Sequence, residues 1–328
     1  MVELSIVIPN YNNEKYIKKC IDSILNQTFV KYEIIIVDDG SSDNSVEIIE
    51  SMKKKNNKIK LIRQFNQNAA IARNKGIEIA KGKYILFIDS DDYINDNDSI
   101  KNMIDKIENN DLLLCNYKVV DENGNYKYDY KVGDDIITDG SNIIEKYAFI
   151  SAVPTNKLFD MKIIRDHNIF FDNVDIGQDL NFYLKYLAFC NNVIITDDYS
   201  YCYRINNEGM TRKKNYRFLD IIKSVDCVRN FYKNNHIESI GVIDSVGLIN
   251  YCAQMNRIEK YEQRRDRLFI YEYFNYFIKD LTIEKKYIET NKKLKRTLKV
   301  YRLRKNMKLI YLSNCYKSIK KVLLKIKK

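Results

Sequence analysis

The sequence predicts an α/β fold, a mainly parallel sheet with helices on both faces, followed by a helical C-terminal extension. In residues 1–116, short β-branched apolar runs alternate with segments whose apolar residues recur every three or four positions, which is typical of repeated strand–helix units. After about Asn215 the chain has no proline and two glycines, and its apolar spacing is helical. Its 328 residues, 45% of them hydrophobic, suffice for one large domain or two smaller ones.

The elements of the first part follow in order from local patterns. Residues 33–37 form a near-continuous β-branched run, as expected of a strand that is buried on both faces. Ile17, Ile21 and Ile24 fall on one face of a helix. By the same criteria we expect strands at 4–9, 33–37, 59–62, 84–88 and 112–115, and helices at 17–25, 46–52, 71–80 and 100–107.

The pattern changes after these units. A polar stretch with one glycine, residues 122–125, separates two tyrosine-rich segments and predicts a hairpin. Residues 155–205 read as short helices and strands that carry unusual polar residues. We expect a domain over 1–212, made of halves at about 1–116 and 117–212, and a helical extension over 213–328 with a basic tail at 285–328.

The net charge of +11 is concentrated in that tail. Residues 285–328 hold 17 of the 55 basic residues and one of the 44 acidic ones, which leaves the rest of the chain mildly acidic. A nucleic-acid-binding protein that is basic throughout is therefore excluded. Apolar residues recur at helical spacing between the lysines and arginines of the tail, which favours a helix lying on an anionic membrane surface. The alternatives are a helix packed on the body or on a second subunit, and a nucleic-acid contact.

Cysteine usage and hydropathy indicate the compartment. The seven cysteines include no CxxC pair, so we expect neither a disulfide framework nor a zinc site, and reduced thiols in a cytoplasm fit better. The N-terminus reads as a strand rather than a signal peptide, and no window approaches about 18 consecutive apolar residues. We expect a cytoplasmic protein, peripheral on the inner face of the cell membrane.

Polar clusters follow three of the predicted strands. They are residues 9–12 (PNYN), 38–43 (DDGSSD) and 89–92 (DSDD). Ligands of such sheets bind beyond the carboxyl ends of the strands. One aromatic ring and several carboxylates on the same rim predict a ligand site there.

The carboxylates of this rim suggest a cation and a nucleotide. Asp89 and Asp91 are two residues apart and can face one side, which suits Mg2+ or Mn2+ bound together with a substrate diphosphate. Asp39 can accept a hydrogen bond from a base such as uracil, on which Tyr11 would stack. In both places the alternative is a polar turn that caps the next helix.

These motifs together resemble family 2 glycosyltransferases of the GT-A fold, of the bacterial surface-polysaccharide type. The resemblance is carried over residues 4–92 by IVIPNYN, Gln27-Thr28, EIIIVDDGSSD, ARNKG and YILFIDSDD, in that order. It continues more weakly through NKLF at 156–159, GQD at 177–179 and Tyr203-Arg204, so it covers about 1–212. It implies a nucleotide-sugar half at about 1–116 and an acceptor half at about 117–212.

The resemblance implies roles on the donor side. Tyr11 matches the residue that stacks on the uracil of a UDP-sugar, and Asp39 the residue that hydrogen-bonds its edge. Pro9 matches the start of that loop, and Arg73 a basic residue near the nucleotide.

It also implies the reacting groups. Asp89 matches the residue that contacts ribose, Asp91 the metal ligand of the DxD motif, and Asp92 completes the acidic run. Asp179 matches the catalytic base, with an ordinary acid in the first turn of a helix as the alternative. In that turn the helix dipole would favour the ionised form.

Two positions depart from the family. Gln178 replaces the glutamate that usually precedes the base, which removes a like charge that would raise the pKa of Asp179. We expect altered acceptor contacts through Gln178 rather than loss of activity. Asn68 stands where the family commonly has glycine; because asparagine tolerates positive φ, we expect the turn to persist.

The implied reaction is an inverting, metal-dependent transfer. Asp179 would take the proton of an acceptor hydroxyl, while Mn2+ or Mg2+ at Asp91 offsets charge on the leaving diphosphate. Arg204 precedes a polar loop through residues 210–212 and is a diphosphate candidate on a closing lid, or a surface residue. His167 and His236 fit structural or exposed positions better than catalysis.

The sequence thus predicts transfer of one sugar from a nucleotide sugar to a hydroxyl of a glycan acceptor. We expect the donor to be a UDP-sugar and the acceptor to be lipid-linked, as in capsule synthesis. The absence of tryptophan argues against processive synthases, which carry a QxxRW motif. One alternative is a nucleotidyltransferase, against which the absence of glycine in residues 9–12 counts. The other is a catalytically degenerate membrane-associated scaffold, motivated by Gln178. A homo-oligomer is compatible with either interpretation.

Overall fold

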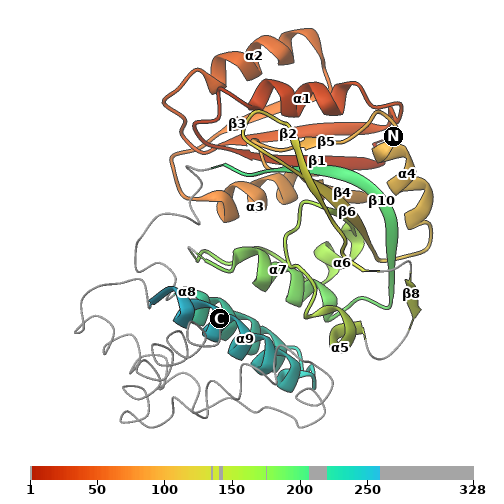
Figure 1. The fold of residues 1–328 in the computed structure, drawn as a ribbon, viewed down its shortest axis with the longest axis vertical. Coiled ribbons are helices and arrows are strands. Elements are labelled where there is room, and N and C mark those ends of the chain that lie inside the picture. Colours follow the sequence, from red (N-terminus) through yellow and green to blue (C-terminus); the bar gives the residue numbers. More distant parts are fainter. Residues whose placement is uncertain (1, 134–135, 140–142, 175, 207–219, 259–328) are drawn as a thin grey trace, which may run out of the picture. The chain divides into compact units, whose positions relative to one another are not determined.

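A computed structural model describes residues 2–258 except 134–135, 140–142, 175 and 207–219 (Figure 1). The chain divides into two compact units, Met1–Asp220 and a second that begins at Ile221. The predicted lid at 210–212 and the basic tail at 285–328 lie outside the described residues. The domain boundary predicted at 212/213 stays a prediction.

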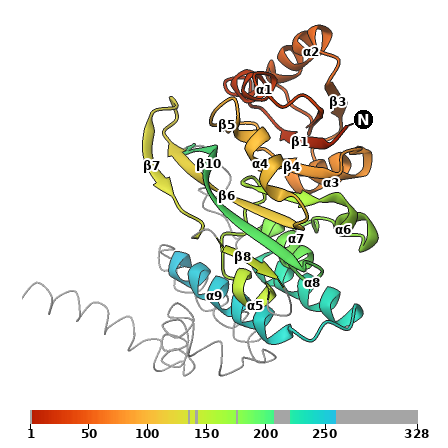
Figure 2. The same cartoon turned by 90° about the vertical axis from the view of Figure 1, so that its right-hand side faces the viewer.

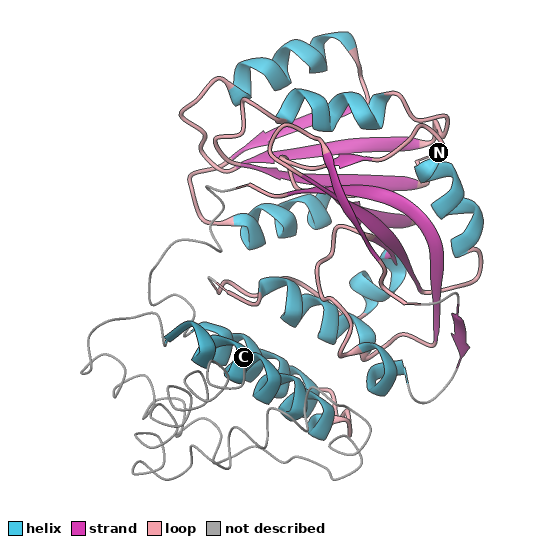
Figure 3. Ribbon diagram, viewed as in Figure 1, coloured by secondary structure: helices cyan, strands magenta, loops and turns pink. Residues whose placement is uncertain are grey.

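The first unit is built on one sheet, coloured magenta in Figure 3. Within the described residues its strand order is β3-β2-β1-β4-β9-β6-β10-β5, with β7 beside β6 and β8 beside β10. The strands are β1 (Leu4–Asn10), β2 (Tyr32–Asp38), β3 (Ile59–Arg63), β4 (Tyr84–Phe87), β5 (Tyr93–Ile94), β6 (Leu112–Val120), β7 (Tyr126–Tyr130), β8 (Ile136–Asp139), β9 (Lys157–Asp160) and β10 (Asn192–Arg204).

Helices flank this sheet. Those of the first unit are α1 (Ile17–Leu25), α2 (Ser45–Lys55), α3 (Ala69–Ile79), α4 (Ser99–Ile107), α5 (Ile143–Tyr147), α6 (Met161–Asp166) and α7 (Gln178–Leu187). Apolar residues of α1 and α4 share a core cluster with one face of the central strands. On the opposite face, α3 packs on β1 and the Phe182 ring of α7 meets those of Phe87 and Phe159. The predicted α/β fold is confirmed.

The sheet is parallel in its first half and mixed in its second. Strands β3, β2, β1 and β4 pair in parallel, as repeated strand–helix units require. Strand β9 then enters antiparallel between β4 and β6, an insertion that the sequence pattern did not resolve because only Leu158 and Phe159 of its four residues are apolar. The hairpin predicted at 122–125 is confirmed by the antiparallel pairing of β6 with β7.

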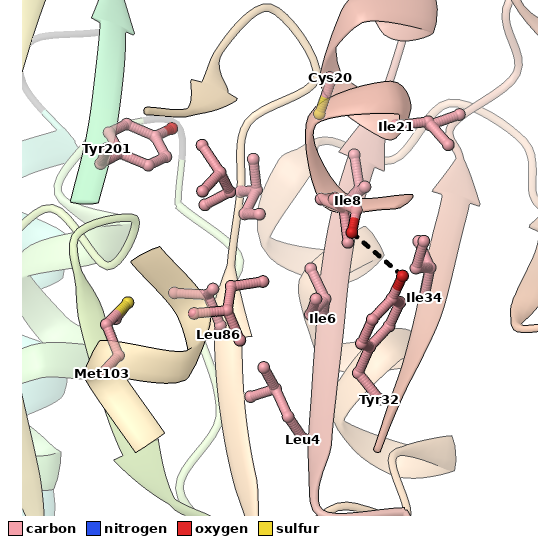
Figure 4. Close-up of a cluster of buried hydrophobic side chains, with 14 of the residues drawn as sticks. Leu4, Ile6, Ile8, Cys20, Ile21, Tyr32, Ile34, Leu86, Met103 and Tyr201 are labelled. Atoms are coloured by element: carbon pink, nitrogen blue, oxygen red, sulfur yellow. Dashed lines mark hydrogen bonds between the residues drawn. The ribbon is translucent and has the colours of Figure 1, made fainter. Parts of the chain in front are cut away.

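The core follows from the alternation of side chains along the strands. Leu4, Ile6 and Ile8 of β1 are fully buried against the apolar stripe of α1, as Figure 4 shows. The Tyr32 hydroxyl at the base of this cluster donates to the carbonyl oxygen of Ile24 (3.0 Å). Helix α1 is thereby fixed next to the loops that leave β1 and β4, where the polar clusters lie.

The second unit contains, in its described part, α8 (Asp220–Asn234) from its second residue onward and α9 (Ile240–Ile258). Arg229 of α8 lies 3.0 Å from the fully buried Asp244 of α9, so an ion pair joins the two helices. A Cβ on Gly247 would lie 2.9 Å from Val225. None of the described helices is both long enough and apolar enough to cross a bilayer.

Candidate active site

The three polar clusters meet at one edge of the sheet, as the sequence predicts. In the parallel register Asn10 of β1 lies beside Asp38 of β2, and Val7 lies beside Phe87 of β4. The Asp39 amide donates to the carbonyl oxygen of Asn10 (2.8 Å), which ties the first two loops together. Pro9 lies within β1 and is buried, so it belongs to the strand that carries this loop.

Asp39 anchors the loop that follows β3. Its side chain is 4% exposed and accepts from the Gln64 amide and from the backbone N–H groups of Gln67 and Asn68, each at 2.8 Å. Two carboxylate oxygens offer about four acceptor positions, so one remains for a ligand. Tyr11 lies in the β1–α1 connection, between Asn10 and Asn12, which bond to the loop after β2. It is 49% exposed, as a stacking platform requires.

The predicted turn at Asn68 persists. Its φ is +92°, and its side chain accepts from the N–H groups of Ala70 and Ile71 to begin α3. About two turns further, a Cβ on Gly76 would lie 2.3 Å from Val7. Glycine is therefore needed there for α3 to lie close on β1, and this close packing brings Arg73 of α3 to the end of β4.

Arg73 joins the two carboxylates that the sequence places on opposite halves of the domain. Its guanidinium is buried, and its Nη2 lies 2.7 Å from Asp89 and its Nη1 3.1 Å from Asp179. Both carboxylates keep about a third of their side-chain surface accessible, 35% and 36%. One buried cation thus holds the first aspartate of the DxD motif next to the predicted base, which follows Arg73 by 106 positions in sequence.

Asp179 lies in the first turn of α7, as predicted, because Gly177 at φ +86° begins that helix. Its pKa differs from the expected direction. Desolvation raises the pKa of Asp179 and outweighs the lowering by Arg73, while Asp89 raises it further. The helix dipole, which alone would favour the ionised form, is therefore not the dominant influence.

Gln178 points away from solvent. It is 8% exposed and its amide donates to the carbonyl oxygen of Val174 (2.6 Å). This bond closes the turn that leads into α7, so Gln178 supports the position of Asp179. An acceptor contact through Gln178 stays a prediction.

The other two carboxylates of the DxD motif differ in their surroundings. Burial raises the pKa of Asp91, and the nearby Asp89 raises it further. Asp92 is 2% exposed and accepts from the Tyr201 hydroxyl (2.5 Å) and the Arg204 amide (2.7 Å). Asp92 therefore anchors β10 in this structure, and a contact with the donor stays a prediction.

Arg204 orders the backbone around the motif. It is 4% exposed; its Nε donates to the carbonyl oxygen of Asp91 and its Nη1 to that of Glu122, both at 2.7 Å. Its guanidinium also lies 4.7 Å from the centre of the Tyr16 ring. The diphosphate contact predicted for Arg204 stays a prediction, since these bonds join the DxD loop to the β6–β7 turn.

The donor set fits a hard divalent cation. The described residues contain no group of three or more His, Cys, Asp and Glu side chains in an arrangement that could hold a metal. Mg2+ and Mn2+, however, are commonly held by one or two carboxylates, with substrate phosphates and water supplying the rest. Asp91 would be the carboxylate in this site, and its role as a metal ligand stays a prediction.

Lys157 was not assigned a role from sequence. It begins β9, is fully buried, and donates to the carbonyl oxygen of Val153 (2.6 Å) and to Asn156 Oδ1 (2.9 Å). Burial lowers its pKa to about 7, although Asp179 and Cys115 oppose this. The signal in the sequence was a lysine inside the apolar NKLF segment.

Comparison with known proteins gives consistent matches. The glycosyl transferase family 2 model matches residues 5–167. Glycosyltransferase GlyG of Streptococcus pneumoniae serotype 4 is 31% identical over 245 residues, which are 70% of this chain and 78% of GlyG. The poly(ribitol-phosphate) beta-glucosyltransferase of Bacillus spizizenii is 34% identical over 214 residues, 63% of this chain and 33% of that protein. The crystal structure of Staphylococcus aureus TarS with UDP-GlcNAc has a TM-score of 0.70 at 23% identity, covering 86% of this chain and 82% of that one, and shares the fold.

Proposed function

Because the chain belongs to glycosyltransferase family 2, we propose that it is an inverting transferase that moves one sugar from a nucleotide sugar to a hydroxyl of a glycan. The observation that carries this proposal is the Arg73 bridge, at 2.7 Å to Asp89 and 3.1 Å to Asp179. A donor-side and an acceptor-side carboxylate are thereby held at one point, as a single displacement requires.

Asp179 is the proposed base. The acceptor hydroxyl gives its proton to this carboxylate as its oxygen bonds to the anomeric carbon, and the bond to the diphosphate breaks on the opposite face. The configuration at the anomeric carbon is thereby inverted. A base works best when its pKa lies near the working pH, and desolvation moves the pKa of Asp179 in that direction. Arg73 orients the carboxylate toward the donor.

The proposed donor is a UDP-sugar. Tyr11 supplies an exposed ring for the base, and Asp39 keeps an acceptor position for its N–H edge. TarS, which shares the fold, has been crystallised with UDP-GlcNAc. Asp91, aided by Asp89, would hold Mn2+ or Mg2+, which when bound offsets the charge that develops on the leaving diphosphate.

The proposed acceptor is a growing surface polysaccharide, expected to be lipid-linked. Support comes from the relatives, one of which is a poly(ribitol-phosphate) glucosyltransferase, and from the basic amphipathic tail at 285–328, which suits an anionic membrane. Deleting 285–328 should release the protein from anionic vesicles in a flotation assay. Unchanged flotation of the truncated chain would remove the membrane part of the proposal.

The catalytic proposal is tested with paired variants. Calorimetry with UDP-, GDP-, CMP- and dTDP-sugars, with Mn2+ and with chelator, should show metal-dependent binding of one UDP-sugar. Asp91→Ala should weaken that binding, whereas Asp179→Asn should retain it and stop transfer. Transfer by Asp179→Asn at the wild-type rate would refute the base. A folded wild-type chain that binds no nucleotide sugar would favour the scaffold interpretation.

A further inference from the structure

A cleft lies beside the DxD loop. It has a volume of about 440 Å3 and is bounded by Tyr93 of β5 and Tyr126 of β7, with Lys118, Asp129 and Asn95 between and beside them. We call it the hairpin groove. Figure 2 shows β7 next to β6, at the edge where β10 also ends.

The strand register places these side chains on one face. Tyr93 pairs with Cys202, Cys202 with Lys118, and Lys118 with Asp129, across β5, β10, β6 and β7. Register partners on neighbouring strands point to the same side of a sheet. An irregularity in the β6–β7 register, between Val119 and Val120, places Tyr126 on this side as well. The hairpin groove is thus one continuous surface of four strands.

The composition of the groove suits a carbohydrate. The Tyr126 ring offers an apolar face to the C–H groups of a sugar ring, and tyrosine also carries a polar hydroxyl. The Tyr93 ring is covered by the Lys19 ammonium, 3.8 Å from its centre, so it bounds the groove beside a positive charge. The ammonium, carboxylate and amide groups between them provide donors and acceptors for sugar hydroxyls. Tyr126 is 59% exposed, so its ring is open to a ligand. The volume lies within the ~300–1,000 Å3 typical of small-ligand sites.

The groove is connected rigidly to the proposed catalytic site. Tyr93 follows Asp91 by two positions, and Arg204 bonds the carbonyl oxygens of both Asp91 and Glu122. The hairpin turn is fixed there by Gly124, whose φ is +90°. A Cβ at this position would lie 2.9 Å from Lys19 and 3.6 Å from Arg204. A ligand bound in the groove therefore lies at a fixed position relative to the DxD loop.

We propose that the hairpin groove binds a sugar unit of the acceptor glycan, with Tyr126 stacking on the ring and Lys118, Asp129 and Asn95 contacting its hydroxyls. This inference rests on the proposed function and extends it, because it assigns part of the acceptor specificity to the β6–β7 hairpin. A saccharide longer than one unit is then recognised better than a monosaccharide.

The test compares two exposed tyrosines of one strand. Tyr126→Ala removes a groove ring. Tyr128→Ala is the matched control, because Tyr128 is 52% exposed and pairs with Val119, outside the groove. Full-length protein is applied to an array of bacterial-type oligosaccharides with UDP and Mn2+ present. We expect wild type and Tyr128→Ala to retain the same saccharides and Tyr126→Ala to bind them at least about tenfold more weakly, as for loss of one central aromatic contact.

A fluorescence measurement gives an independent readout. Since the chain has no tryptophan, Tyr126→Trp places a single indole at the groove, and its emission should change on addition of the retained saccharides. Equal array binding by Tyr126→Ala and wild type, or no saccharide bound at all, would overturn the inference. Calorimetric donor binding in parallel separates the two proposals. Intact donor binding with no effect of Tyr126 refutes the groove alone, whereas absent donor binding refutes the proposed function.

Discussion

Replacing Arg73 by methionine tests the electrostatic basis of the site. Methionine is apolar and of similar length, so the change removes the cation and leaves the packing of α3 largely intact. Asp89 and Asp179 then lose the guanidinium at 2.7 and 3.1 Å. Since Arg73 lowers the pKa of Asp179 against the effects of burial and Asp89, its loss raises that pKa further. The base is then protonated over a wider pH range, and the acid limb of the kcat/KM profile moves to higher pH.

The cost in stability can be bounded from the same geometry. Removing one partner of a fully buried pair costs about 3–5 kcal/mol, whereas exposed pairs contribute about 0–1 kcal/mol. The guanidinium is buried, but each carboxylate is about a third accessible, 35% and 36%. We therefore expect a loss of roughly 1–2 kcal/mol. For a domain of this size, that loss of stability lowers Tm by about 2–8 °C.

The pH profile distinguishes this role from a merely structural one. Arg165→Met is the control, since the Arg165 guanidinium donates to the carbonyl oxygen of Ala80 (2.8 Å), away from the proposed base. Both variants are measured for kcat/KM between acid and neutral pH and for Tm. A lowered Tm in Arg73→Met, with an acid limb that coincides with wild type, would refute the assignment of Arg73 to the base.

Three further changes test neighbouring interactions. Asp39→Asn removes part of a three-bond anchor, so it should lower the free energy of unfolding by about 2 kcal/mol and weaken UDP binding. The control Asp22→Asn, in an exposed ion pair, should leave Tm within about 1 °C of wild type. Equal thermal shifts in the two variants would refute the anchoring role of Asp39. Lys157→Met removes a cation that lowers the pKa of Asp179, so the acid limb should move to higher pH, and an unmoved limb would show that this charge does not reach the base. Burial would raise the pKa of Glu33, but bonds from Lys60, Ser5 and the Lys81 amide lower it, so its stabilisation is present above its unfolded pKa and is lost as pH falls through the folded value. Glu33→Gln should therefore cost about 2 kcal/mol in urea denaturation at neutral pH, and the difference from wild type should disappear well below pH ~4.

The sequence determined the fold class and the rim on which the site lies. Apolar periodicity is a local signal, so the units from β1 to α4 could be predicted in order. Polar clusters after three buried strands had to meet at one edge, because parallel strands end on the same side. The positive φ at Asn68 could also be predicted, since asparagine tolerates the conformation that the turn requires.

The tertiary structure decided which of these polar groups remain open to a ligand. Ligand binding by Asp92 and Arg204 stays a prediction, but the structure shows that both are buried in the bonds that hold β10 and the DxD loop. Their partners lie about a hundred positions away, and no local pattern encodes such a contact. The same reason applies to the pKa of Asp179: the helix dipole is visible in sequence, but the desolvation that outweighs it and the Arg73 cation that opposes it are set only when α3 and α7 meet at the end of β4.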